Sequence, residues 1–179
     1  MCPALRRGTT HRPLPRRHRP PEHRQRIDPA RIGAMGTSYG GYTVARLAFT
    51  DKRVKAVVSH CGLIHEALNR GPATIKSLPP VTRAALAARY NVPVSDTEQL
   101  GRVARRSSLA NQKLVGTIRT NTSILAINTA DDPIAPVSDL KRLAASSTDG
   151  KVVVTSGSGH CEPFDESYEA ATSWLKRKL

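Results

Sequence analysis

The chain of 179 residues is long enough for one domain with a buried core, and its hydrophobic fraction of 39% is typical of a soluble globular protein. No stretch approaches the roughly 20 consecutive apolar residues of a membrane-spanning helix, and no apolar region follows the first arginines as in a signal peptide. We therefore expect a cytoplasmic protein without a membrane partner. The formal net charge of +14 raises the question of nucleic-acid binding.

The positive charge is concentrated at the start of the chain. Residues 1–31 contain nine arginines, six prolines and three histidines, against two acidic residues. Residues 1–26 have almost nothing apolar to bury, so we predict a disordered basic arm. The arm lacks the aromatic residues of a base-stacking surface, so we expect no nucleic-acid partner. Such a composition is also typical of out-of-frame translation of GC-rich DNA. We hypothesise that origin, and sequencing across the start codon tests it.

From residue 27 onward, β-branched runs alternate with helical patterns. We predict strands at 31–35, 54–60, 124–128 and 152–155, and helices at 38–49 and 137–145. A last helix carries one apolar face, made of Phe164, Tyr168, Ala171 and Leu175, with acidic residues at its start and basic residues at its end. This alternation predicts a parallel α/β sheet with right-handed crossovers.

Residues 63–122 interrupt the alternation, because they contain no strand-like run. Their helical pieces are separated by Pro72, Pro79-Pro80 and Pro93, and 95–98 has the form of a capping box that opens a helix. We predict a helical cap insertion over the strand ends, within a domain that spans 27–179. Ordinary packing helices remain the alternative.

A nucleophile motif lies between the first predicted strand and its helix. Residues 36–40 match G-x-S-x-G, in which Gly36 and Gly40 are expected to let the chain turn sharply and present the hydroxyl of Ser38. The backbone N–H of Tyr39 would then lie at the helix start, where it can bind an oxyanion. A turn rich in Gly and Ser is often only structural. The interpretation of Ser38 as a nucleophile therefore rests on the position of the motif between a predicted strand and a predicted helix.

A serine nucleophile needs a base that a carboxylate orients. Asp132 follows the third predicted strand and His160 the fourth, which gives the chain order nucleophile, acid and histidine. We predict His160 as the general base and Asp132 as its orienting acid. Asp131 is the alternative acid, although it could instead cap the turn.

The remaining cysteines and histidines favour no metal site. Cys2, Cys61 and Cys161 are odd in number and widely spaced, so we expect reduced thiols rather than a disulfide framework or a zinc site. His60 and His65 flank Cys61 at a spacing that fits no standard metal motif, and we expect them to form a polar lining of the pocket. We therefore expect no metal and no cofactor.

Several stretches resemble the α/β-hydrolase superfamily and, within it, the FrsA-like esterases. They are RIGAMGTSYGGYTVARLA, KAVVSHCG, SLANQKLVG, DDPIAP and the tail from SSTDG to the last residue, so that the resemblance covers about 27–179. It implies a single-chain serine hydrolase with a helical cap, acting on small-molecule esters or related acyl substrates. Some relatives cleave carbon–carbon bonds of β-diketone-type substrates, and that activity is an alternative here.

This sequence differs from the family pattern ahead of the nucleophile strand. A full α/β-hydrolase has several strands ahead of the nucleophile strand, and an early loop that donates the second oxyanion N–H. We therefore expect an α/β-hydrolase fold that lacks its N-terminal strands, with the nucleophile strand at the edge of a four-stranded sheet. Such an exposed edge would permit self-association. Loss of one oxyanion donor typically costs about 10²–10³ in rate. A catalytically impaired, truncated fragment is thus a further alternative.

Overall fold

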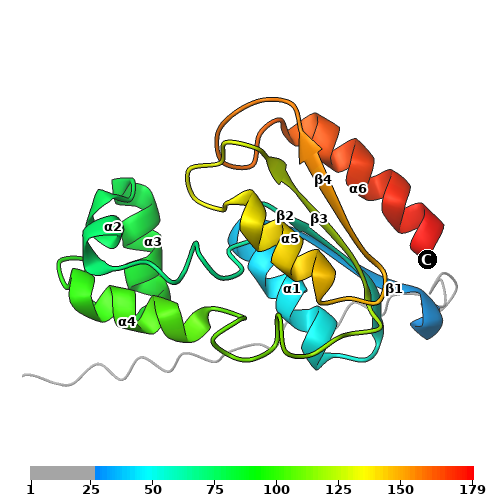
Figure 1. Ribbon diagram of the computed structural model, residues 1–179, viewed down its shortest axis with the longest axis horizontal. Coiled ribbons are helices and arrows are strands. Elements are labelled where there is room, and N and C mark those ends of the chain that lie inside the picture. The colour runs from blue at the N-terminus through cyan, green and yellow to red at the C-terminus, as the bar shows by residue number, and fades with distance from the viewer. Residues whose placement is uncertain (1–26) are drawn as a thin grey trace, which may run out of the picture.

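The computed structural model describes residues 27–179 as one parallel sheet with helices on both faces (Figure 1). The predicted basic arm lies outside the described residues. The sheet order is β1-β2-β3-β4, and every neighbouring pair is parallel. The strands are β1 (Ile32–Thr37), β2 (Val54–His60), β3 (Ser123–Thr129) and β4 (Gly150–Thr155). The predicted parallel α/β sheet is confirmed, with strand ends that differ by at most two residues.

Three helices cover the sheet. Helices α1 (Tyr39–Thr50) and α5 (Val137–Ala145) pack on one face, and α6 (Phe164–Lys178) packs on the other (Figure 1). Val57 of β2 faces the α1 side, whereas Val58 faces α6 and packs with Trp174. Because both faces are covered, the central strands carry apolar residues at consecutive positions rather than in strict alternation.

The buried face of α6 agrees only in part with the expected one. Ala171 is buried and Leu175 packs beside it, as expected, but Phe164 and Tyr168 are 48% and 50% exposed, and Ser167 and Trp174 are buried in their place. Trp174 has the largest apolar surface on this helix, and its burial against β2 and β3 fixes the rotation of the helix. Phe164 instead lies near the ring of His60, with centroids 6.1 Å apart.

The segment between β2 and β3 forms three helices, α2 (Pro72–Ser77), α3 (Pro80–Tyr90) and α4 (Thr97–Ser107). They lie to one side of the sheet (Figure 1) and share a small core of their own with Ile75, Ala87 and Leu100. Asp96 caps α4 by accepting a 2.8 Å hydrogen bond from the Gln99 N–H. The cap is therefore one residue later than the expected box that begins at Ser95, because the Asp96 carboxylate is in place to accept that N–H.

Strand β1 pairs only with β2 among the described residues, so it is an edge strand there, as expected. Leu175 and Leu179 pack over one face of β1, because a side chain at Gly33 would meet both of them. In the part of the chain that the structure describes, no helix combines the length and apolar character needed to cross a membrane.

Candidate active site

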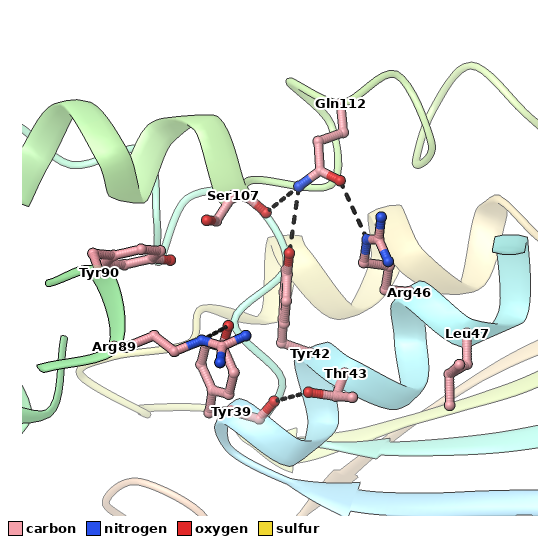
Figure 2. Close-up of a pocket in the computed structure, with 9 residues that line it drawn as sticks. All are labelled: Tyr39, Tyr42, Thr43, Arg46, Leu47, Arg89, Tyr90, Ser107 and Gln112. Carbon is pink, nitrogen blue, oxygen red and sulfur yellow. Dashed lines mark hydrogen bonds between the residues drawn. The ribbon is translucent and has the colours of Figure 1, made fainter.

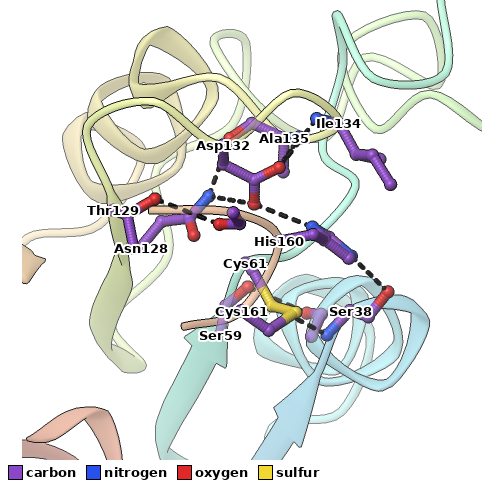
Figure 3. The surroundings of a disulfide bond; sticks show 12 residues. Ser38, Ser59, Cys61, Asn128, Thr129, Asp132, Ile134, Ala135, His160 and Cys161 are labelled. Atoms are coloured by element: carbon purple, nitrogen blue, oxygen red, sulfur yellow. Dashed lines mark hydrogen bonds and ion pairs between the residues drawn. A yellow bond between two sulfur atoms is a disulfide. The ribbon is translucent and has the colours of Figure 1, made fainter. Parts of the chain in front are cut away.

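The predicted site residues meet where the parallel strands end. Ser38 directly follows β1, Asp132 lies in the turn after β3, and His160 lies in the loop after β4 (Figure 3). Because the carboxyl ends of parallel strands share one edge of a sheet, residues far apart in sequence converge there.

Ser38 occupies a sharp turn between β1 and α1. Its backbone has φ 54° and ψ −116°, in a region that side-chain-bearing residues rarely adopt. Its N–H donates to the carbonyl oxygen of His60 at 2.9 Å, and its Oγ lies 2.8 Å from His160 Nε2. A strained strand-to-helix turn that presents a serine hydroxyl is the geometry of a nucleophile elbow.

The glycines of this turn have unequal roles. A Cβ on Gly36 would lie 2.3 Å from the carbonyl oxygen of Gly40, so that position requires glycine. A Cβ on Gly40 would meet nothing within 4 Å, which contradicts the steric role expected for it. Gly41 is the crowded position instead, since a Cβ there would lie 2.8 Å from the carbonyl oxygen of His60 and 2.9 Å from Gly62 Cα. Gly41 is where α1 packs against the end of β2.

The carboxylate of Asp132 is buried and fully partnered. Its Oδ2 lies 2.7 Å from His160 Nδ1 and accepts from Asn128 Nδ2 at 2.8 Å, and its Oδ1 accepts from the N–H groups of Ile134 and Ala135. Burial alone would raise the pKa of Asp132, but the hydrogen bonds from His160 and the other donors outweigh it and hold the pKa below the ordinary value. Asp132 is therefore an anion at neutral pH.

Of the two candidate acids, Asp132 is the one that contacts His160. Asp131 is exposed, and its carboxylate accepts a hydrogen bond from the Thr129 hydroxyl at 3.2 Å instead. Sequence reasoning missed Asn128, whose amide also donates to the carbonyl oxygen of Ala135 at 2.7 Å. The only signal for Asn128 was a buried polar residue near the end of an apolar strand.

Cys61 and Cys161 form a disulfide, which contradicts the expectation of reduced thiols. Cys61 directly follows β2 and Cys161 directly follows His160, so the same convergence of strand ends brings them together (Figure 3). That shared edge was the signal in the sequence, and the separation of 100 residues concealed it. With the His160 ring, their ligand atoms lie within 4.8 Å of one another, but sulfurs joined to each other are not the thiolates that bind zinc.

Neither flanking histidine is among the residues that line the cavity beside Ser38, where the sequence analysis expected them. The His60 ring is buried, and both ring nitrogens lack a hydrogen-bond partner within the described residues. Burial, followed by the nearby His160, lowers the pKa of His60, so the ring is neutral at pH 7. His65 bonds through Nδ1 to Ser108 Oγ at 2.8 Å, and its N–H donates to the buried carboxylate of Asp139. These contacts anchor the chain where it leaves the sheet.

An apolar cavity of about 420 Å³ opens beside Ser38. One wall is Leu63, which follows β2, and the opposite wall is α3. The complete lining is Ser38, Tyr39, Leu63, Val81, Thr82, Ala85, Leu86 and Arg89. Of the helices between β2 and β3, α3 therefore contributes surface that a molecule bound at Ser38 would meet.

A second cavity of about 440 Å³ lies between α1 and the segment of α3 and α4 (Figure 2). Tyr39 and Arg89 line both cavities. Arg89 Nε donates to the Tyr39 hydroxyl at 2.9 Å, and the guanidinium carbon lies 5.1 Å from the centroid of the Tyr39 ring. This contact joins the helical segment to the first turn of α1, directly beside the serine.

Comparison with known sequences identifies a family for this chain. The sequence profile described as "Esterase FrsA-like" matches residues 23–179. Esterase FrsA of Vibrio cholerae serotype O1 is 32% identical over 154 residues, which are 86% of this chain and 37% of the relative. The chain thus spans little more than a third of the length of the curated relatives it matches.

Comparison with solved structures gives one fold. AbyA5 aligns with a TM-score of 0.67 at 19% identity, over 85% of this chain and 45% of the other. The 2,6-dihydroxy-pseudo-oxynicotine hydrolase aligns with a TM-score of 0.64 at 19% identity, over 86% and 41%. At this identity, the likeness shows the fold alone, and the described strands correspond to part of each neighbour.

Proposed function

The chain belongs to the FrsA-like esterase family, and from that premise we propose that it is a serine hydrolase of small-molecule esters. Ser38 is the nucleophile, His160 the general base and Asp132 the orienting acid. The observation that carries the proposal is the continuous chain of contacts from Ser38 Oγ through both ring nitrogens of His160 to the buried carboxylate.

The geometry supports a two-step acyl transfer. Ser38 Oγ attacks the ester carbonyl carbon while His160 Nε2 takes the hydroxyl proton, and Asp132 stabilises the imidazolium through Nδ1–H. When the tetrahedral intermediate collapses, His160 gives that proton to the leaving alcohol, and an acyl ester of Ser38 remains. Water, deprotonated by His160, then attacks the acyl carbon, releases the carboxylic acid and restores the Ser38 hydroxyl.

The negative charge of the intermediate develops beside the start of α1. Tyr39 is the first residue of this helix, and the N–H groups of a helix's first turn have no intrahelical acceptor. The helix dipole also favours an anion at this end. We assign the Tyr39 N–H as an oxyanion donor on these grounds.

The cavity beside Ser38 favours an apolar group on the substrate. Val81, Leu86 and Leu63 are aliphatic residues of its lining, and fully burying an aliphatic side chain of such size is worth roughly 1.5–3 kcal/mol. We therefore propose esters with a short to medium apolar acyl chain. Residues of α3 act as a cap that sets chain length.

A fluorophosphonate probe tests the proposal, because it reacts covalently only with an activated serine. The unmodified protein is expected to label on one serine, and Ser38→Ala is expected to abolish labelling and the hydrolysis of p-nitrophenyl butyrate. Ser173→Ala is the matched control, because Ser173 is exposed on α6 away from the sheet edge. Retained labelling in folded Ser38→Ala would overturn the assignment.

A further inference from the structure

We propose that the disulfide between Cys61 and Cys161 positions the His160 ring to accept the hydroxyl proton of Ser38. This inference rests on the hydrolase function proposed above. The bond joins the residue after His160 to the residue after β2. It also reaches the nucleophile, because the Ser38 N–H lies 3.3 Å from Cys61 Sγ. One covalent link therefore connects the neighbourhoods of both reacting side chains (Figure 3).

The loop that carries His160 has few other restraints. His160 contacts Asp132 through Nδ1. The Thr129 hydroxyl donates to the carbonyl oxygen of Gly159 at 3.2 Å, and the Ser156 hydroxyl donates to the Glu166 carboxylate at 2.8 Å. The ring itself is held by its contact with Asp132 and by the Ser38 hydroxyl, which lies 2.8 Å from Nε2. The disulfide is thus the only covalent restraint within the described residues on the side of the loop that faces β2.

Both cysteines are held in the left-handed region that favours glycine. Cys61 has φ 46° and Cys161 has φ 67°. A side-chain-bearing residue leaves this conformation readily when nothing holds it there. Once the bond is broken, we expect the backbone at Cys161 to relax and to carry the preceding His160 ring away from Ser38 Oγ.

The expected consequence is a loss of kcat with little change in KM. Proton transfer needs Ser38 Oγ and His160 Nε2 within hydrogen-bonding distance, and a displacement of about 1 Å can cost about 10²-fold in rate. The cavity wall on α3 contains neither cysteine, so ground-state binding of the ester should persist. A general loss of folding would instead lower the fraction of folded protein, while kcat per folded molecule would stay unchanged.

Reduction by dithiothreitol is the direct test. The reagent supplies two electrons and two protons, the S–S bond breaks, Cys61 and Cys161 become thiols, and the reagent becomes a cyclic disulfide. Because Cys61 is fully buried, thiols are counted in denaturant: in protein prepared without reductant, we expect one alkylated cysteine before reduction and three after it. Reduction in the presence of EDTA, which removes metal from the freed thiols, should slow fluorophosphonate labelling of Ser38 by about tenfold or more. Reoxidation with oxidised glutathione should restore the labelling rate.

Two variants separate positioning from other thiol effects. Cys61→Ser with Cys161→Ser should label as slowly as the reduced protein and should be insensitive to dithiothreitol. Cys2→Ser should label at the full rate and keep its sensitivity. Circular dichroism at the assay temperature confirms that each sample is folded.

The outcomes distinguish this inference from the proposed function. Equal labelling of the folded oxidised and reduced proteins, or three alkylated cysteines before reduction, overturns the positioning role and leaves the hydrolase intact. Absence of labelling in the oxidised protein overturns the hydrolase itself. A reduced protein with raised KM and unchanged kcat also contradicts positioning of His160.

Discussion

The two sides of the site are built by different physical means. On the sheet side, Ser38, Asp132 and His160 are held by short hydrogen bonds, a buried carboxylate and a disulfide. On the side of α3, the cavity is lined by exposed or half-buried side chains, such as Val81, which is 76% exposed. Directional polar contacts fix positions closely, whereas apolar contacts tolerate changes in shape.

This contrast assigns a different task to each side. If the proposed hydrolase function holds, the strand ends place the reacting atoms, so a small change there should affect kcat. Helix α3 lines the apolar cavity, so a change there should affect which ester is accepted. The two sides meet at Tyr39, whose hydroxyl accepts from Arg89 of α3 and whose backbone opens α1.

The largest effect is expected where the polar network is broken. Asp132→Asn replaces the buried anion by an amide that cannot stabilise the His160 imidazolium, and we expect kcat for p-nitrophenyl butyrate to fall about 10³-fold or more. KM should change little. Asp131→Asn is the matched control, because that carboxylate does not contact His160. A loss below tenfold in folded Asp132→Asn would show that the contact with His160 is not used in the reaction.

A second test concerns the packing beneath the elbow. Gly41→Ala forces a methyl group against the backbone of His60 and Gly62, which cannot yield without moving the end of β2. We expect a loss of about 3 kcal/mol in the free energy of unfolding, measured by urea titration. Gly40→Ala, one position earlier in the same helix turn, meets open space and should be neutral or stabilising by up to about 1 kcal/mol. Equal losses in both variants would mean that the turn, rather than this close approach, sets the cost.

The sequence predicted the elements that depend on local pattern. Four short runs of apolar or small residues identified the strands, although the insertion at 63–122 separates the second from the third, and a parallel sheet then required that Ser38, Asp132 and His160 share one edge. It did not predict the disulfide or the crowding at Gly41, because both depend on the distance between segments that periodicity does not encode. The predicted apolar face of α6 was half right. Ala171 and Leu175 pack against β2 and β3 as expected, but Phe164 and Tyr168 are exposed, and Trp174, which the stripe left out, is buried.

A third prediction addresses the helical side. Ala85 lines the cavity beside Ser38, so Ala85→Trp should fill part of it. We expect kcat/KM for p-nitrophenyl hexanoate to fall about 10- to 100-fold, with a much smaller loss for the acetate ester. Ala84→Trp is the control, because Ala84 is exposed on the same helix and does not line the cavity. If both esters lose rate equally, the substitution has disturbed the sheet edge and the separation of tasks is wrong.

The smallest effect is expected from pH. The folded-state pKa of Asp132 lies below its unfolded value, so its contribution to stability is fully present above the unfolded pKa of about 4 and is lost as the pH falls through the folded pKa. Asp149, paired with Lys178, and Asp51, paired with Arg53, have lowered pKa values too, so acid weakens several contacts together. The difference in unfolding free energy between the unmodified protein and Asp132→Asn cancels these shared contributions. That difference should shrink between pH 6 and pH 3, and a difference independent of pH would show that Asp132 gains no net stabilisation of its charge from His160 and the neighbouring N–H groups.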